Sequence, residues 1–185
     1  MAALDGAGRR EQHTTNIVTV DEAGNACVLT TSLGLGSGDY LPGLDLHLNS
    51  MLGETDLVAG GIPEPGKRIP SMTAPTFVLA ADGPVLAAGA AGGTRLRTAL
   101  LTAAAGVLDE GLLPQEAVDM PRVHPDGGVV HAEPGADEDG LEALEAAGWT
   151  VRRWPEQHHY FGGVSLVAPA GGAADPRRSG AALAA

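Results

Sequence analysis

The sequence predicts an α+β domain in which antiparallel strands are covered by helices. Three observations lead to this class. Short runs of β-branched and apolar residues alternate with Gly/Pro-rich turns, patterns with a helical period occur only in the second half, and strands return near the end. Because most strands are joined by short connections, antiparallel pairing is favoured. The 185 residues, 44% of them apolar, suffice for one domain with its own core.

Strands predominate in the first half of the chain. Residues 16–20 and 26–32 flank the turn sequence DEAGN and are predicted to form a hairpin. A flexible loop is expected over residues 34–43. A half-buried strand is expected over residues 44–49, because apolar and polar residues alternate there. Residues 52–70 then form a long Gly/Pro-rich connection, a type of segment that is usually functional in a compact domain.

The second half adds two helices between further strands. The first helix is expected from Thr94, the predicted N-cap, to Gly111, and the second over residues 138–148. The apolar positions of the first helix are Leu96, Leu100, Leu101 and Val107. The predicted strands are residues 76–90, which the Asp82-Gly83 turn divides in two, 127–133, 149–154 and 162–168. The last 15 residues, rich in Ala and Gly, are expected to trail off as a tail.

Charge and cysteine count exclude several classes of function. The net charge of −12 repels nucleic acid and anionic membranes, which leaves a small molecule or a protein as partner. Cys27 is the single cysteine, so no intrachain disulfide can form, and no Cys/His spacing resembles a metal site. The first 13 residues lack the apolar run of a signal peptide, so a cytoplasmic location is expected unless a partner subunit directs export. The six histidines are predicted to be mostly surface or loop residues: His13, His47, His124, His131, His158 and His159.

A Thr14-Thr15 pair stands where the first strand begins, directly after 13 residues with no predicted structure. A Thr hydroxyl is a poor nucleophile in water, but the free α-amino group of an N-terminal Thr can act as its base. Cleavage between His13 and Thr14 would create that arrangement. The alternative is that both threonines are simply β-branched residues at the start of a strand.

Two further segments are candidate sites. In GAAGGTR, the backbone N–H groups of Gly92 and Gly93 precede a helix and are suited to hold an anion, either a phosphate or the oxyanion of an acyl-transfer intermediate. The segment lacks the Lys of a Walker A loop, and a tight turn that needs small residues is the alternative. GKRIPSMTAPT offers Ser71 and Thr73, for which hydrogen bonding within the loop is the alternative.

The order of these motifs over residues 13–180 resembles the small, catalytic subunit of γ-glutamyltranspeptidase. The matching segments are TT, VDEAGNA, LN before Met, GKRIPSMTAPT, GAAGGTR, DMPRVH and DPRR. The family belongs to the N-terminal nucleophile hydrolases, so the resemblance implies an α+β fold that forms the small-subunit half of an αββα sandwich. It also implies a propeptide-like segment or large-subunit remnant at residues 1–13, a catalytic domain at 14–180 and a tail at 181–185.

The resemblance gives roles to the candidate residues around the first strand. Thr14 corresponds to the nucleophile, and Thr15 completes the family's Thr-Thr pair. Asn16 stands where the family usually has His. Ser32 takes the place of a Thr whose hydroxyl assists the nucleophile.

The remaining roles fall on the two other segments. The oxyanion-binding glycine pair of the family falls on Gly92 and Gly93. One of the two serines that hold the substrate carboxylate falls on Ser71. Its neighbour falls on Pro70, so a donor is lost.

The residues that bind the γ-glutamyl group in typical members differ most. Gly34 matches an Asn, while Ser50 and Gly53 match a Gln and an Asp. Ser50 is then the candidate substrate contact at these positions, and Glu54 or Asp56 is expected to replace the missing carboxylate. Losing the partners of a charged head group lowers discrimination by orders of magnitude, so the resemblance does not carry glutathione specificity over.

The resemblance as a whole implies a γ-glutamyltransferase-like amide hydrolase or acyltransferase, similar to glutathione hydrolases, that exposes Thr14 by self-cleavage. It implies a small-molecule amide substrate and no metal or organic cofactor. Two alternatives stay open: a non-catalytic or truncated binding module of the same fold, and an acylase with another acyl specificity. Since 13 residues precede Thr14, a separate large subunit or a homo-oligomer is expected to cover the open sheet. In the family, the large subunit supplies an arginine that binds the substrate carboxylate.

Overall fold

The chain divides into two compact units. One comprises Met1–Thr14 and Thr31–Ser71, and the other comprises Thr15–Thr30 and Met72–Ala185. This computed structural model describes residues 13–53, 58, 61, 64–81 and 83–184. The candidates Glu54 and Asp56, the turn residue Asp82 and residues 1–12 lie outside the described residues. In the described part, no helix is long and apolar enough to cross a bilayer.

A four-stranded antiparallel sheet forms the centre of the larger unit. Its strands are β5 (Thr76–Ala80), β6 (Gly83–Ala91), β10 (Gly163–Ala168) and β11 (Gly171–Ala174), in the order β11-β10-β6-β5. Every residue of β6 from Leu86 to Ala91 is buried, so both faces of this strand are covered. Its mostly small side chains let the neighbouring layers approach closely. The strands expected within residues 76–90 and 162–168 are thereby confirmed.

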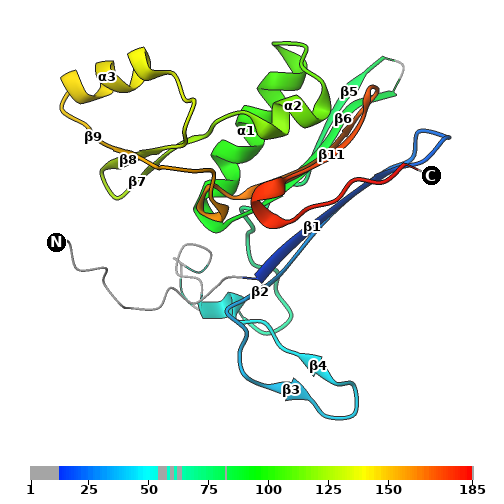
Figure 1. The fold of residues 1–185 in the computed structure, drawn as a ribbon. Helices are drawn as coiled ribbons and strands as arrows, with labels where there is room; N and C mark the ends of the chain where they lie inside the picture. Colours follow the sequence, from blue (N-terminus) through cyan, green and yellow to red (C-terminus); the bar gives the residue numbers. More distant parts are fainter. Residues whose placement is uncertain (1–12, 54–57, 59–60, 62–63, 82, 185) are drawn as a thin grey trace. The chain divides into compact units, whose positions relative to one another are not determined.

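Helix α1 (Leu96–Leu108) packs on β6 and β10 and covers one face of this sheet (Figure 1). It follows a 3-10 turn at Gly93–Arg95, so the N-cap is Arg95 and the prediction of Thr94 is wrong. Leu101 is 69% exposed, because small residues instead complete the face that meets the sheet. The core between helix and sheet contains Leu86, Ala88, Ala90, Leu96, Ala99, Leu100, Ala103, Val118, Val164 and Leu166.

A second short helix, α2 (Pro114–Asp119), packs on β10 and β11 and was not expected from the sequence. Pro114 occupies the first helical position, where a missing N–H has no consequence. The Glu116 carboxylate accepts the N–H of Leu113 at 2.9 Å and so satisfies one donor at the helix start. The signal was therefore present in the sequence, as Pro followed two positions later by Glu.

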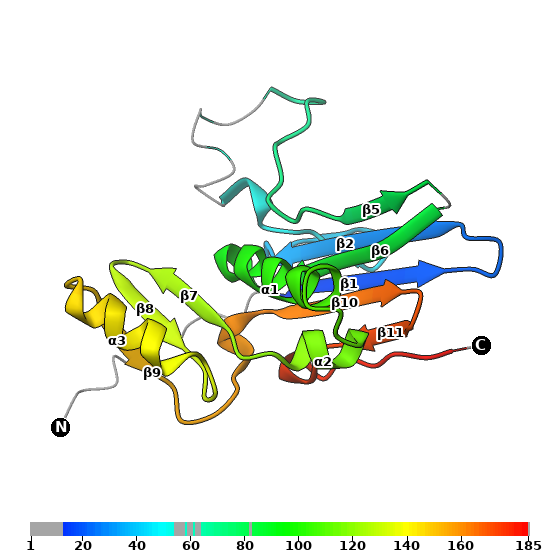
Figure 2. The same ribbon diagram turned by 90° about the horizontal axis from the view of Figure 1, so that it is seen from above.

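The hairpin of β1 (His13–Val20) and β2 (Ala26–Gly34) was expected and is confirmed. Within the larger unit, residues 15–30 of this hairpin lie on the face of the central sheet opposite α1 (Figures 1 and 2). Contact between the two layers is close. A Cβ atom at Gly89 of β6 would lie 2.1 Å from the side-chain nitrogen of Asn16. The larger unit thus has helix, sheet and hairpin layers in that order.

A three-stranded sheet with its own helix completes the larger unit. Its elements are β7 (Val123–Asp126), β8 (Val129–Ala132), α3 (Glu138–Ala146) and β9 (Thr150–Arg153). β7 and β8 are antiparallel, but β8 and β9 are parallel, and α3 is the crossover that parallel pairing requires. The helix expected at 138–148 is confirmed, whereas β7 was missed.

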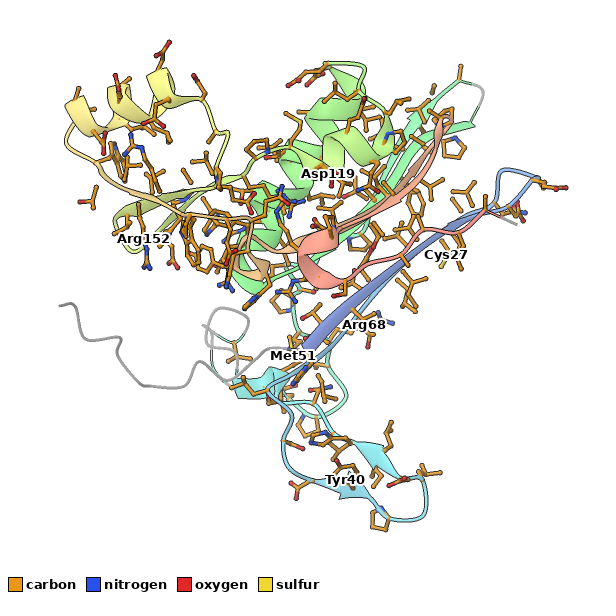
Figure 3. The ribbon with its side chains drawn as sticks, viewed as in Figure 1. Cys27, Tyr40, Met51, Arg68, Asp119 and Arg152 are labelled. Atoms are coloured by element: carbon orange, nitrogen blue, oxygen red, sulfur yellow. The ribbon has the colours of Figure 1, made fainter. Side chains whose placement is uncertain are left out.

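The smaller unit contains a short hairpin of β3 (Tyr40–Leu41) and β4 (Leu46–His47). Part of it falls in residues 34–43, which were expected to be a flexible loop. The rings of Tyr40 and His47 stack with their centroids 4.6 Å apart, and Figure 3 shows Tyr40 on this hairpin. The His47 imidazole also fills the space that a side chain at Gly36 would need. These contacts order a segment that its Gly content alone would leave flexible.

The chain after residue 170 is not a tail, so that prediction is wrong for its first half. β11 pairs along its length with β10, and a 3-10 turn, η4 (Pro176–Arg178), follows. Asp175 and Arg177 are only 2% and 8% exposed. Small residues in β11 allow it to lie under α2, and buried ion pairs fix the turn after it.

Candidate active site

Thr14 and Ser32 lie close together in the smaller unit. The Thr14 Oγ1 and Ser32 Oγ atoms are 3.1 Å apart, and both side chains are half-buried. Ser32 Oγ also accepts the N–H of Gly34 at 3.1 Å and lies 3.5 Å from the carbonyl oxygen of His13. One hydroxyl therefore contacts both the candidate nucleophile and the carbonyl of the peptide bond that precedes it.

Thr15 is exposed, whereas Thr14 is half-buried. Successive residues of a strand point to opposite faces, so the two hydroxyls of the pair do not share a face. This alternation explains why the two neighbouring threonines have different surroundings.

Asn16 follows on the half-buried face of β1. Its Nδ2 donates to Thr30 Oγ1 at 2.7 Å and to the Leu29 carbonyl at 3.3 Å. Its Oδ1 is buried and has no hydrogen-bond partner among the described residues. The residue that replaces the family's usual His is thus held by β2 and by the close approach of Gly89.

In the larger unit, Gly92 and Gly93 form a sharp corner between β6 and α1. Their φ angles are 140° and 59°, values that favour glycine. A Cβ at Gly92 would lie 2.6 Å from the Cα of Gly162, so even an alanine would clash with that backbone. The corner precedes a helical turn, where the first N–H groups have no partner within the helix. The arrangement is suited to hold negative charge.

A buried ionic network supports this corner from the side of Gly162. Arg122 is 1% exposed and donates to the carbonyl oxygens of Phe161 and Gly162 at 3.2 and 3.1 Å. It also pairs with Asp175, whose carboxylate accepts the backbone N–H of Val164 at 3.0 Å. Burial lowers the pKa of Arg122, while the charge of Asp175 opposes that effect.

Arg177 completes the network by pairing with Glu133 and by sharing Asp175 with Arg122. It bonds Glu133 through Nε at 2.7 Å and through Nη2 at 2.6 Å, and it also bonds Asp175. None of Arg122, Glu133, Asp175 and Arg177 was named as a site residue from the sequence. For Arg122, Asp175 and Arg177 the signal lay in the DMPRVH and DPRR motifs, which carry Arg and Asp in otherwise apolar surroundings.

The other candidates of the smaller unit lie around its connecting loops. Ser50 Oγ accepts the N–H of Leu35 at 2.8 Å, so its hydroxyl holds the segment after β2. Gly53 is exposed in the 3-10 turn η1 (Met51–Gly53). Ser71 is exposed just before the chain enters the larger unit, and Pro70 beside it is also exposed.

The histidines are less peripheral than expected. His124 is 6% exposed, and its Nδ1 lies 3.0 Å from Thr98 Oγ1. Burial lowers its pKa. His131 and His158 are half-buried and lie in ring contact with Trp154. Their residue type alone did not reveal that a strand and an aromatic cluster would enclose them. In the described ranges, no group of three His, Cys, Asp or Glu residues is placed to hold a metal ion.

Comparison with known proteins agrees with this architecture. The family model described as gamma-glutamyltranspeptidase matches residues 2–185. The acylase ACY 1 proenzyme of Pseudomonas sp. (strain V22) is 30% identical over 88% of this chain and 29% of its own length. The glutathione hydrolase proenzyme of Escherichia coli (strain K12) is 31% identical over 75% of this chain and 27% of its own length. The chain thus spans less than a third of these curated relatives.

A solved structure extends the likeness to the fold. The γ-glutamyltranspeptidase from Pseudomonas nitroreducens complexed with L-DON superposes with a TM-score of 0.76 at 26% identity, covering 92% of this chain and 99% of that chain. The α+β class and the N-terminal nucleophile hydrolase fold are therefore confirmed. From the family model, the relatives and the fold together, the chain belongs to the γ-glutamyltranspeptidase family.

Proposed function

We propose that this chain is the catalytic small subunit of an amide hydrolase or acyltransferase whose nucleophile is Thr14, exposed by self-cleavage after His13. The observation that carries the proposal is the position of Ser32. Its hydroxyl lies 3.1 Å from Thr14 Oγ1 and 3.5 Å from the His13 carbonyl oxygen. The Ser32 side chain thus contacts both the attacking atom, Thr14 Oγ1, and the carbonyl group of His13 that Thr14 must attack.

In the proposed maturation, Thr14 Oγ1 attacks the carbonyl carbon of His13 and transfers its proton to the nitrogen of Thr14. The carbon–nitrogen bond breaks, and the acyl group of His13 remains as an ester on Oγ1. Water hydrolyses this ester, which restores the hydroxyl and leaves a carboxylate on His13. Thr14 then carries both a hydroxyl and a free α-amino group, the pair that an N-terminal nucleophile needs.

In the proposed turnover, the α-amino group takes the proton of the hydroxyl while Oγ1 attacks an amide carbonyl. The N–H groups of Gly92 and Gly93 stabilise the oxyanion, as the family's glycine pair does. The amine of the substrate leaves with the proton, and an ester on Thr14 remains. Water or an acceptor amine then releases the acyl group. All atoms come from the chain, the substrate, and water or the acceptor amine.

An acyl group other than γ-glutamyl is the second candidate, and the geometry of Ser50 favours it. The position that carries Gln in typical members has here a short hydroxyl that already accepts the Leu35 N–H at 2.8 Å. Gly34 and Gly53 offer no side chain at the neighbouring positions. The similarity to an acylase over 88% of the chain also supports an acyl group other than γ-glutamyl. We therefore propose an acyl specificity closer to that of an acylase.

A separate large subunit is part of the proposal. Both curated relatives above are named proenzymes, and this chain spans less than a third of each, yet it covers 99% of the solved chain. Within the larger unit, the outward face of the hairpin exposes Ile17 and Leu29 by 51% and 53%. Leu79, on the edge strand β5, is 71% exposed. Apolar surface of this kind favours a covering partner.

The test is to co-express the chain with its partner subunit and measure its intact mass and amide hydrolysis. We expect loss of residues 1–13, and we expect Thr14→Ala to abolish both cleavage and turnover. Thr15→Ala is the matched control and should only weaken them. Ser32→Thr should cleave, while Ser32→Ala should cleave more slowly.

The same preparation tests specificity. γ-Glutamyl-p-nitroanilide should be a poorer substrate than other acyl anilides. Turnover by Thr14→Ala, or a wild-type chain that stays at full length beside its partner, would overturn the proposed function. In the second case a non-catalytic module of the same fold would remain. Preference for the γ-glutamyl anilide would overturn only the acylase-like specificity.

A further inference from the structure

Arg178 lies against the backbone of Gly163 and beside that of Gly92. It ends the turn η4, and its stem runs across the start of β10. A Cβ at Gly163 would lie 2.7, 3.0 and 3.2 Å from Cδ, Cγ and Cβ of Arg178. A Cβ at Gly92 would lie 3.7 Å from its Nη2. The absence of a side chain at Gly163 leaves room for the arginine stem, whereas the distance at Gly92 is that of an ordinary van der Waals contact.

The guanidinium of Arg178 forms no ion pair with a carboxylate in the described part of the chain. Its Nε is buried and, among the described residues, without a hydrogen-bond partner. The carboxylate of Asp175, whose charge acts on Arg178, is already paired with Arg122 and Arg177. Arg178 is therefore an additional positive charge next to an already balanced network.

Arg95, two residues after Gly93, adds to this excess of positive charge. Its Nε donates to the Tyr160 carbonyl at 3.1 Å, and its guanidinium carbon lies 5.0 Å from the centre of the Tyr160 ring. Burial and the charge of Arg95 lower the pKa of Arg178, while Asp175 opposes them. The chain as a whole has a net charge of −12. Arg95 and Arg178 thus concentrate positive charge at one corner of an acidic chain.

We propose that Arg178 is a positioning residue that holds an unneutralised positive charge behind the Gly92–Gly93 corner and strengthens its N–H groups as donors to a developing oxyanion. The inference rests on the proposed function. An unpaired buried donor destabilises the resting protein. A charge a few ångströms from the corner stabilises an anion formed there, and the effect is largest where water is excluded. The residue thus acts through the corner and contacts no reacting atom.

A structural role alone makes a different prediction. If the stem of Arg178 serves only to pack on Gly163, an uncharged chain of similar length should replace it. If the charge matters, a lysine should replace it and a methionine should not. Arg97 is the matched control, because it is an exposed arginine two residues after Arg95.

The first measurement needs no activity. Base-catalysed exchange of an amide proton passes through an anion on the peptide group, so its rate reports the electrostatic potential at that N–H. Exchange at the half-exposed Gly93 N–H is measured by NMR on the isolated chain. We expect about tenfold slower exchange in Arg178→Met, from one charge at short range in a partly aqueous surrounding. Arg178→Lys and Arg97→Met should stay within about twofold of wild type.

The second measurement is amide hydrolysis by the complex with the partner subunit. Arg178→Met should lower kcat about tenfold and leave KM within about twofold, because the charge acts on the transition state. Arg178→Lys should restore most of the rate. If Arg178→Met does not fold, Arg178→Gln is the second neutral variant.

Unchanged Gly93 exchange in a folded neutral variant would overturn the inference, and so would equal slowing in Arg97→Met or in Arg178→Lys. A wild-type complex without Thr14-dependent turnover would instead overturn the proposed function. In that case slower exchange in Arg178→Met would still show that the charge acts on the corner, so the two failures are distinguishable.

Discussion

Arg177 and Arg153 are each held by two carboxylates, one in the interior and the other at the surface. Arg177 and its partner Glu133 have fully buried side chains. The side chain of Arg153 is 39% exposed and bonds Glu138 and Glu145 at 2.6 and 2.8 Å. Both sites contain an arginine and two carboxylates, so the comparison shows the effect of burying the ion pair.

The two arginines join very different parts of the chain. Besides its carboxylates, Arg177 donates to the carbonyl oxygens of Val118 and Met120, both at 3.0 Å. It thereby ties the turn after β11 to the end of α2 and to the segment after β8. Arg153 only ties α3 to β9. An interior ion pair must satisfy every polar atom, and in doing so it becomes a joint between distant segments.

The largest effect should come from Arg177→Met. It leaves the carboxylate of Glu133 buried without its partner, which is expected to lower the free energy of unfolding by about 3–5 kcal/mol. Urea unfolding followed by circular dichroism measures the change. The paired variant Arg177→Met with Glu133→Leu should recover part of the loss. A loss no larger than that of a surface pair would contradict the comparison.

A smaller effect is expected from Arg122→Lys. The charge opposite Asp175 is kept, but an ammonium cannot reach both that carboxylate and the carbonyl oxygens of Phe161 and Gly162. The expected loss is about 1–3 kcal/mol in the same urea experiment. Proton NMR shifts of Gly162 and Gly92 should change together, since their backbones touch. Wild-type stability and shifts would show that charge alone holds this joint.

The smallest effect should come from Arg153→Met, with no resolvable change in the urea midpoint at about pH 7. Hydrogen bonds from Arg153 lower the pKa of Glu145. A carboxyl with a lowered pKa stabilises the fold above its ordinary pKa and loses this contribution on acidification. Any difference between variant and wild type should therefore shrink as the pH falls below the ordinary pKa of a Glu carboxyl. A difference that grows on acidification would contradict the assigned pair.

The sequence predicted local secondary structure correctly where turn residues or hydrophobic periodicity were distinct. The first hairpin has an Asp at its turn whose carboxylate accepts the N–H groups of Ala23 and Asn25 at 3.0 and 2.8 Å. By contrast, β11 consists of Gly and Ala, which carry no strand signal, and its pairing with β10 decides its structure. The prediction that these residues form a tail was wrong for that reason.

Thr14 was singled out as a candidate nucleophile by its chemistry, whereas Ser32 was assigned only through the family resemblance. Thr14 and Ser32 were named in advance, and their side chains are in contact. The buried network was missed, because Arg and Asp are usually exposed and no local pattern shows that partners far apart in sequence will enclose them. Arg122 and Asp175, for example, are 53 positions apart. Such contacts follow from tertiary packing.

The close approach of Asn16 to Gly89 makes these two positions a coupled pair. The Asn16 amide occupies the volume that a Cβ at Gly89 would take. A larger residue at position 89 is compatible with this layer spacing only if residue 16 becomes smaller. The His that the family usually has at residue 16 cannot be accommodated by space taken from position 89. Variation among related chains at the two positions is therefore expected to be correlated, with the sum of the two side-chain volumes nearly constant.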